Sequence, residues 1–347
     1  MKISEAASQK IKNMSLLCAM LVVAIHVKWP SEVALSLGWF IDKGVKGGIA
    51  RIAVPFFFVV SGFFLVQHLD EHGWWKRETV KRIKSLMVPF VIWSLAYVLA
   101  TIPLSVIADI IAHRPFGTSI CIMKAGGWPL LFGFDLTEFP MHVPLWYVRC
   151  LFLFVLSAGA FKWVIDRWGC AWLVFAFAFV LVQNHIPNEN WRQFFRMGYS
   201  ASGIFYFSVG IMIGRRKFKM LGNKLALACT VIGITLLITR MVFAYHGWRG
   251  EIAIGKLSLP FLIYAVWHYM SAARWPAWLT SCSFSIFLIH SIMLSYAGLA
   301  VKHLYTTEPS VNATTAQYCC GVALSIIAAV VMRRLAPKAA AIAFGGR

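Results

Sequence analysis

Long apolar runs are the feature of this sequence that most limits what it can fold into. A run of about 20 apolar residues is long enough to cross the hydrocarbon core of a membrane as an α-helix. Backbone groups in hydrocarbon must be hydrogen-bonded within the chain, and these runs exceed the alternating segments of about 10 residues typical of membrane β-barrels. The sequence therefore predicts an all-α polytopic membrane protein with about ten transmembrane helices. The ten segments are residues 11–29, 49–69, 84–108, 144–161, 170–186, 200–214, 224–244, 252–271, 279–302 and 316–333.

Composition excludes the alternatives to a membrane protein. Apolar residues make up 60% of the 347 residues and charged residues only 13%, about half the charged share of an ordinary soluble domain. A water-soluble core could not enclose 27 Phe and 15 Trp. We find no internal repeat, linker or soluble appendage. We therefore predict a single integral-membrane domain over residues 1–347, with a helical core at about 11–335.

The net charge of +20 fits a membrane topology. Lys and Arg accumulate in cytoplasmic loops, and the two densest basic clusters, Lys76–Lys84 and Arg215–Lys224, fall on the cytoplasmic side if the N-terminus does. Ten spans then place both termini in the cytoplasm. Because the charge is spread over several short segments rather than one face, we expect no nucleic-acid partner. The first apolar run is interpreted as an uncleaved helix, since bulky Leu37 follows its only cleavage-like site.

Apart from those in the first or last two positions of a span, seven Lys, Arg and His residues lie inside the predicted spans. Each is a functional candidate because a charge in hydrocarbon is costly. We expect Arg240 and Lys256 to extend to the outer surface and His268 to lie at the interface. No Asp or Glu lies inside a predicted span, which counts against an ion-coupled transporter. The seven residues are His26, Arg51, Arg149, Arg240, Lys256, His268 and His290.

Four of these residues lie at similar heights in the membrane. Counted at about 1.5 Å per helical residue, His26, Arg51, Arg149 and His290 all lie between the midplane and the outer side. This is compatible with one polar cavity open to the outer face. A single histidine in a transmembrane helix is also a common packing residue, so both interpretations stay open for His290.

Metal and disulfide chemistry find no support in the sequence. The eight cysteines form no Cys-x-x-Cys motif, so we interpret them as small buried apolar residues. The histidines inside the spans lie on separate predicted helices. We therefore predict no metal site.

The stretch from Arg51 to Phe64 carries the most specific pattern. It contains Arg-x-x-x-Pro-Phe-Phe-Phe-x-x-Ser-Gly-Phe and begins 25 residues after His26. Three further motifs follow: Lys81-Arg82-Ile83 with Pro89-Phe90 and Trp93, then Leu145-Trp146-Tyr147, then the segment from Ser283 to His290. Together, in this order, they resemble the acyltransferase-3 family. Members of that family are integral membrane proteins, typically of ten helices, that O-acylate cell-surface glycans.

The resemblance implies a membrane-bound O-acyltransferase of the bacterial inner membrane. Such an enzyme moves an acyl group, normally acetyl, from cytoplasmic acyl-CoA to a hydroxyl of a cell-surface or lipid-linked glycan, so we expect acyl-CoA, the glycan and membrane lipid as partners. A sugar hydroxyl needs a base near it, and we assign this role to His26 because histidine titrates near working pH. Arg51, Arg149 and His290 are candidates for stabilising the oxyanion of the tetrahedral intermediate.

The resemblance also implies cations that bind the CoA phosphates, for which Lys12, Lys81 and Arg82 are our candidates. Many family members carry a basic residue eleven positions before the first-helix histidine. Ser15 stands there in this chain, so we expect Lys12, about one helical turn lower, to make that contact. Three alternatives stay open: an acyl-enzyme at Ser61, ranked below direct transfer; a transporter or flippase for a lipid or glycan; and a non-catalytic membrane partner.

Overall fold

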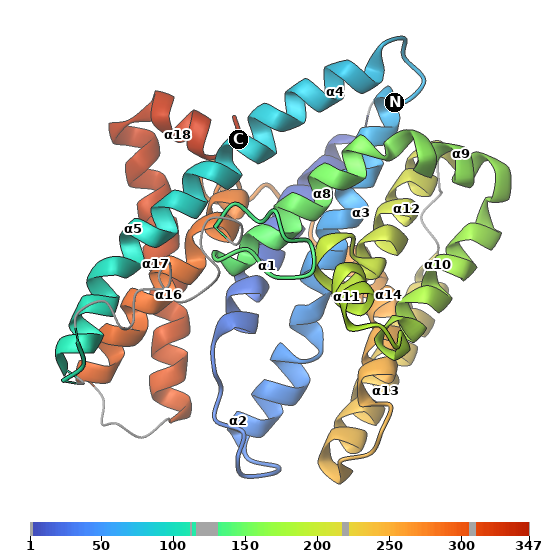
Figure 1. Cartoon of the computed structure of the whole chain (residues 1–347). Coiled ribbons are helices and arrows are strands. Elements are labelled where there is room, and N and C mark those ends of the chain that lie inside the picture. Colours follow the sequence, from blue (N-terminus) through green and yellow to red (C-terminus); the bar gives the residue numbers. More distant parts are fainter. Residues whose placement is uncertain (1–2, 112, 116–130, 217–221, 305–309, 347) are drawn as a thin grey trace. The chain divides into compact units, whose positions relative to one another are not determined.

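The computed structural model describes residues 3–111, 113–115, 131–216, 222–304 and 310–346. Across these residues the chain is predominantly helical and contains no strand (Figure 1), so the predicted all-α fold is confirmed. The chain divides into two compact units, which we describe separately. Unit 1 comprises Met1–Val60, Arg216–Phe287 and Met293–Ile327, and unit 2 comprises Ser61–Arg215, Leu288–Ile292 and Ala328–Arg347.

Unit 1 begins with α1 (Glu5–His26), where the side chain of Ser4 accepts a hydrogen bond from the amide of Ala7 at 3.3 Å, as an N-cap residue does. After a connection, α2 (Leu37–Phe40) leads into the π-helix η1 (Ile41–Lys46), the 3₁₀-helix η2 (Ile49–Ile52) and then α3 (Ala53–Leu65). η2 packs against α1. The chain therefore returns to the first helix shortly before the Phe-rich segment starts.

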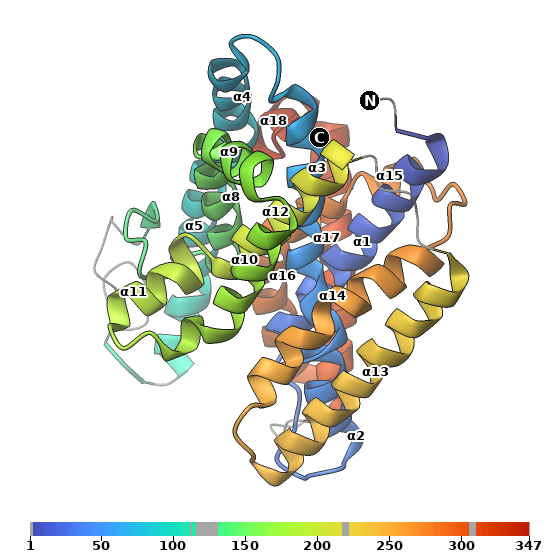
Figure 2. The same ribbon diagram turned by 90° about the vertical axis from the view of Figure 1, so that its right-hand side faces the viewer.

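A helical hairpin forms the other main part of unit 1. Its helices α13 (Asn223–His246) and α14 (Glu251–Tyr269) lie side by side, as Figure 2 shows. The connection uses Gly247 and Gly250, whose positive φ angles of 66° and 104° suit glycine. η1 packs against α13, and η2 packs against α14. The segment from η1 to η2 is thus held by three helices of unit 1.

Further helices of unit 1 approach one another closely through small residues. They are α15 (Ala277–Thr280) and parts of α16 (Ser283–Leu304) and α17 (Val311–Leu335). A Cβ placed on Gly321 would lie 2.5 Å from Leu294 Cδ2. The amide nitrogen of Gln317 donates to the carbonyl oxygen of Leu294 at 3.2 Å. Small residues at such contacts are typical of membrane helix pairs.

Unit 2 is built around aromatic side chains. The fully buried Phe154 contacts Phe161, Tyr199 and Phe207, with ring centroids 4.8 to 5.4 Å apart, the separation typical of favourable aromatic pairs. The helices of this unit are α4 (Trp74–Arg82), η4 (Ile83–Met87, a π-helix), α5 (Val88–Ile111), η5 (Val143–Leu145), α8 (Trp146–Leu156), α9 (Ala158–Trp168), α10 (Cys170–Val182), η6 (Gln183–His185), α11 (Glu189–Gln193), η7 (Phe194–Gly198, a π-helix) and α12 (Ala201–Arg216), with η3 (Val66–His68) after α3.

The last helix of unit 2, α18 (Pro337–Ala343), packs against α5. The indole of Trp93 donates to the carbonyl oxygen of Ala343 at 2.9 Å and stacks on Phe344, with centroids 5.8 Å apart. Phe344 is fully buried, and the guanidinium carbon of Arg333 lies 5.4 Å from its ring centroid. These contacts hold the residues after α17 against the third predicted span.

Each of the ten predicted segments overlaps an apolar helix of the structure. Among the described residues, eight helices are long and apolar enough to cross a membrane, or nine if the pair Val143–Leu156 and Ala158–Trp168, bent by 66°, counts as one span. The helical segment Cys170–His185 is shorter. The count of ten and the cytoplasmic side of both termini stay predictions. The basic cluster at Arg215–Lys224 includes residues 217–221, which lie outside the described residues.

Candidate active site

His26 is the last residue of α1, and its side chain is exposed while Ala24 and Val27 beside it are buried. The helix ends there because Val27 has an extended backbone. The indole of Trp29 then turns back and donates to the carbonyl oxygen of Ala24 at 3.4 Å, which fixes the exit of the chain. The local fold therefore fixes the position of the imidazole at the end of α1.

Arg51 lies in η2, between Ala50 and Ile52, which are both fully buried, and its own side chain is exposed. Its amide donates to the carbonyl oxygen of Gly48 at 3.0 Å, which closes the 3₁₀ turn. Pro55 falls in the first turn of α3, where a helix does not use the missing amide hydrogen. Arg51 is thus held just before the helix rather than inside it.

The structure brings His26 and Arg51 together within unit 1. η2 packs against α1, and the positive charges of Arg51 and Lys46 both act electrostatically on His26. Two exposed polar side chains thus lie near one another, and each is flanked by buried apolar residues. A histidine and a guanidinium in this relation can act as a base and as a cation that stabilises a developing oxyanion.

Arg149 in unit 2 has a different environment. Its guanidinium is buried and donates to the carbonyl oxygens of Gly133, Asp135 and Glu138 at 2.8, 2.7 and 2.8 Å and of Met197 at 3.2 Å. Both terminal nitrogens are used in these bonds. The contacts favour a structural role, in which Arg149 ties the segment before η5 to η7, and the catalytic role stays a prediction.

His290 also belongs to unit 2 and is fully buried. Sequence reasoning missed a second buried histidine near it: His142, also fully buried, has Nε2 2.8 Å from the carbonyl oxygen of Leu288, two residues before His290. His142 lies outside the predicted spans and was therefore not among the candidates. Its place three residues before the Leu145-Trp146-Tyr147 motif was the available signal.

The predicted donor-binding cation Lys12 lies on α1 of unit 1 with an exposed side chain. The residues on either side hold the helix: Lys10 Nζ donates to the carbonyl oxygen of His268 at 2.9 Å, and the fully buried Asn13 donates to Ser271 and Ala273. Sequence reasoning also missed Asn13. Its two backbone contacts anchor the helix and leave Lys12 accessible.

The other two predicted donor-binding residues, Lys81 and Arg82, lie at the end of α4 in unit 2. Each has a nitrogen 3.5 Å from a carboxylate oxygen of Glu78, which is 2% exposed. The buried carboxylate of Glu78 thus pairs with two basic side chains in the next turn of α4. Lys81 itself stays 57% exposed and is therefore accessible to an anion.

Comparison with known protein families identifies the family of this chain. The family model described as an acyltransferase domain matches residues 11–334, nearly the whole chain. The chain belongs to the acyltransferase-3 family. Comparison with curated proteins and with solved structures returns no match.

As an acyltransferase-3 member, the chain is a membrane acyltransferase with several transmembrane helices. The family implies an acyl donor and an acceptor. Among the described residues, no group of three or more His, Cys, Asp or Glu side chains is placed to hold a metal ion. The matched range includes His26, Arg51 and the other predicted site residues.

Two sequence predictions about charge are corrected by the structure of this acyltransferase-3 member. Arg240 does not extend to the surface: it is 9% exposed and pairs with Glu251, because the hairpin brings that acid back beside it. The expectation of no acid inside a span holds only for the predicted bounds. The helical spans Leu37–His68 and Trp74–Ile107 begin earlier than their apolar cores and include Asp42 and Glu78.

His268 is half-buried, and its Nε2 lies 3.1 Å from the side-chain oxygen of Asn223. Arg215, at the end of α12, is paired rather than available: its guanidinium lies 3.3 Å from Asp70 and 3.2 Å from Asp166. A hydrogen bond from Lys162 and the charge of Arg215 hold the pKa of Asp70 below its usual range. These contacts occupy the guanidinium of Arg215 and leave it less available to an anion.

Proposed function

We propose that this acyltransferase-3 member is an O-acetyltransferase that uses cytoplasmic acetyl-CoA to acylate a hydroxyl of a cell-surface or lipid-linked glycan. The observation that carries the proposal is the proximity of His26 and Arg51 where η2 packs on α1. Neither side chain is needed to fill the apolar core. Their place at a helix end makes them accessible to substrates.

In this mechanism the imidazole of His26 takes the proton of the acceptor hydroxyl. The hydroxyl oxygen forms a bond to the thioester carbonyl carbon, and the carbonyl electrons move to the oxygen, which Arg51 stabilises. The intermediate collapses with cleavage of the carbon–sulfur bond. The imidazolium then returns its proton to the CoA thiolate, which leaves as the thiol.

The position of Lys12 supports a donor that enters from the other end of α1. Lys12 precedes His26 by 14 residues, close to four helical turns, so both lie on one side of the helix about 21 Å apart. The flexible pantetheine arm of CoA would run between them. Lys12 would then hold phosphate while the thioester reaches His26.

Ser61 is a weaker candidate for an acyl-enzyme. Its hydroxyl lies 3.3 Å from the phenolic oxygen of Tyr147 in unit 2, and a phenol with a usual pKa of about 10 is no base at neutral pH. Direct transfer to the acceptor is therefore the form of the mechanism that we propose.

The test uses inside-out membrane vesicles that contain the full chain. Labelled acetyl-CoA is supplied, and label in the glycan and lipid fractions is measured for the wild type, His26→Ala and Arg51→Ala. Loss of a general base is expected to lower the rate about 10²–10⁴-fold. His268→Ala is the matched control and should be nearly silent, because its Nε2 contacts Asn223 rather than a residue of the candidate site.

Transfer that continues at most of the wild-type rate in His26→Ala would rule out general-base catalysis by this residue. A wild type that gives no labelled product in either fraction contradicts the proposed function as a whole. A wild type that moves a labelled lipid or glycan across the membrane without acylating it is a transporter.

A further inference from the structure

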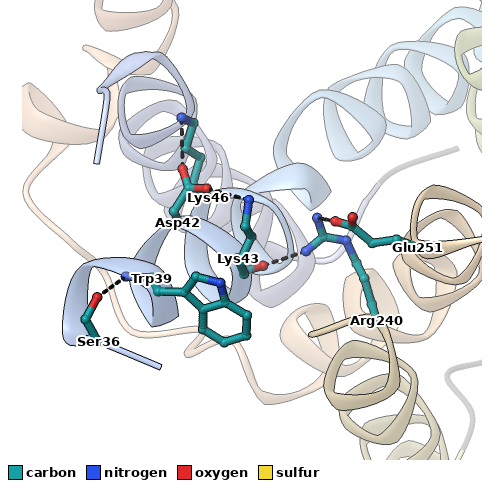
Figure 3. Close-up of polar contacts among 7 residues, drawn as sticks. All are labelled: Ser36, Trp39, Asp42, Lys43, Lys46, Arg240 and Glu251. Atoms are coloured by element: carbon teal, nitrogen blue, oxygen red, sulfur yellow. Dashed lines mark hydrogen bonds and ion pairs between the residues drawn. The ribbon is translucent and has the colours of Figure 1, made fainter. Parts of the chain in front are cut away.

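Arg240 is a buried cation of unit 1, in the second half of α13. Figure 3 shows its guanidinium between two partners. Nη2 lies 2.6 Å from a carboxylate oxygen of Glu251, at the start of α14, and Nη1 donates to the carbonyl oxygen of Lys43 at 2.5 Å. One side chain therefore joins both helices of the hairpin to the π-helix η1.

Glycines make the room for this guanidinium. A Cβ placed on Gly47 would lie 2.7 Å from Nη2 and 2.8 Å from Nη1 of Arg240, and one on Gly255 would lie 2.9 Å from its Cδ. A Cβ on Gly48 would lie 2.2 Å from Leu237 Cδ1. Leu237 and Arg240 are three positions apart and so share one face of α13. The chain between η1 and η2 approaches that face more closely than a larger residue would allow.

The carbonyl of Lys43 links this cluster to the candidate active site. The chain runs from η1 through two glycines directly into η2, which carries Arg51. The carboxylate of Asp42 also holds the ammonium groups of Lys43 at 3.2 Å and Lys46 at 3.1 Å (Figure 3). The ion pairs of Asp42 lie within η1 and hold it together, while the bond from Arg240 fixes its backbone to α13. We therefore expect the position of η1 to determine where Arg51 lies.

A buried ion pair adds little net free energy, because desolvation of the two charges opposes their attraction. In some proteins such a pair instead selects one geometry among several. The guanidinium of Arg240 bonds both to the carboxylate of Glu251 on α14 and to the backbone carbonyl of Lys43 on η1, so it ties η1 to the hairpin at a defined place. This points to geometry rather than stability as its main contribution.

We propose that Arg240 and Glu251 are positioning residues that hold Arg51 beside His26, an inference that rests on the proposed function. They act through the carbonyl of Lys43 and the close contact at Gly47. Neither residue touches the substrates. Their loss lets η2 move away from α1 while donor binding at the other end of α1 is unchanged.

The test compares Arg240→Ala and Gly47→Ala with the wild type. Both variants should lower kcat for acetyl transfer by about 100-fold, the effect typical of a displacement of about 1 Å, with KM for acetyl-CoA changed by less than about twofold. Amide hydrogen exchange of the full chain in detergent should become faster at residues 47–52. Gly222→Ala is the matched control, because no described atom lies within 4 Å of a Cβ placed there, and should leave both measurements unchanged.

Exchange at residues 47–52 that matches the wild type in both variants overturns the inference, as does a loss of activity that comes from KM alone. If Arg240→Ala does not fold, Gly47→Ala carries the test, since it keeps both charges and only displaces the guanidinium. If the wild type transfers no acetyl group, the proposed function fails, and the exchange measurement alone decides whether Arg240 holds η2.

Discussion

Replacing Arg149 with methionine separates a structural from a catalytic role for this residue. Methionine keeps the apolar stem and removes the guanidinium that donates to four carbonyl oxygens. Two of these bonds, to Gly133 and Met197, are buried, and the other two are partly buried. Water can replace the donor only at the partly buried pair.

The expected magnitude follows from the two buried acceptors. Each buried carbonyl left without a donor costs about 1–3 kcal/mol, so Arg149→Met should lower the free energy of unfolding by about 2–6 kcal/mol. Gly133→Ala should also destabilise, since Gly133 has a φ of 62° and an added Cβ would lie 3.2 Å from Arg149 Nη1. Arg77→Met is the control, because Arg77 and its partner Glu71 are half exposed, and exposed pairs contribute about 0–1 kcal/mol.

The assay is unfolding of the purified chain in detergent, followed by tryptophan fluorescence, beside acetyl transfer at a temperature where the variant is folded. We expect a lower unfolding free energy for Arg149→Met and a transfer rate per folded molecule close to that of the wild type. Unchanged stability together with a large loss of transfer would refute this reasoning and assign Arg149 to the oxyanion.

Four further predictions follow from single features. Lys12→Ala should raise KM for acetyl-CoA more than it lowers kcat, and an unchanged KM removes Lys12 from the donor site. The lowered pKa of Asp70 means that its ion pairs stabilise the fold at neutral pH and are lost as pH falls through that pKa, so Asp70→Asn should reduce the melting-temperature difference between neutral and acidic pH. Phe344→Ala should cost about 3–5 kcal/mol of unfolding free energy, as for other fully buried aromatic residues. Reporter fusions at positions 125 and 217, outside the described residues, should report opposite sides of the membrane if the topology is right.

The helices were predictable because the membrane imposes their length and composition. An apolar run of 20 residues has few alternatives to a helix in hydrocarbon, so each predicted segment overlaps one. The predicted spans begin too late where the helix itself starts in polar sequence. The span that includes Glu78 begins at Trp74, in a basic segment that hydropathy alone assigns to a loop.

The candidate site was predictable only in part. The motif at Arg51 and the histidine ending the first apolar run identified two residues that the structure brings together within one unit. Depth along a helix gives height in the membrane but no lateral position. The partners of Arg149 are backbone carbonyls up to 48 residues away, and no residue type in the sequence marks a carbonyl as an acceptor.

The pairing of Arg240 with Glu251 was missed for a different reason. Neither residue indicates the pair by itself, because a long basic side chain near a span end normally reaches the surface. Gly247 and Gly250 between them were the signal of a tight connection. A tight turn at those glycines brings α13 and α14 side by side and places the two charges near one another. The pair is therefore predictable only if opposite charges on the two sides of a predicted turn are considered together.

The number of residues in the π-helix η4 determines how the basic residues before it are oriented relative to the third span. Each residue of an α-helix turns the chain by about 100°, so removing one residue from Ile83–Met87 would rotate Lys81 and Arg82 by about that angle relative to Trp93. Trp93 is held by Ala343 and Phe344 and does not follow that rotation. Relatives that gain or lose a residue in this segment should therefore show matched changes in the basic positions before it or in the aromatic residue that meets Trp93.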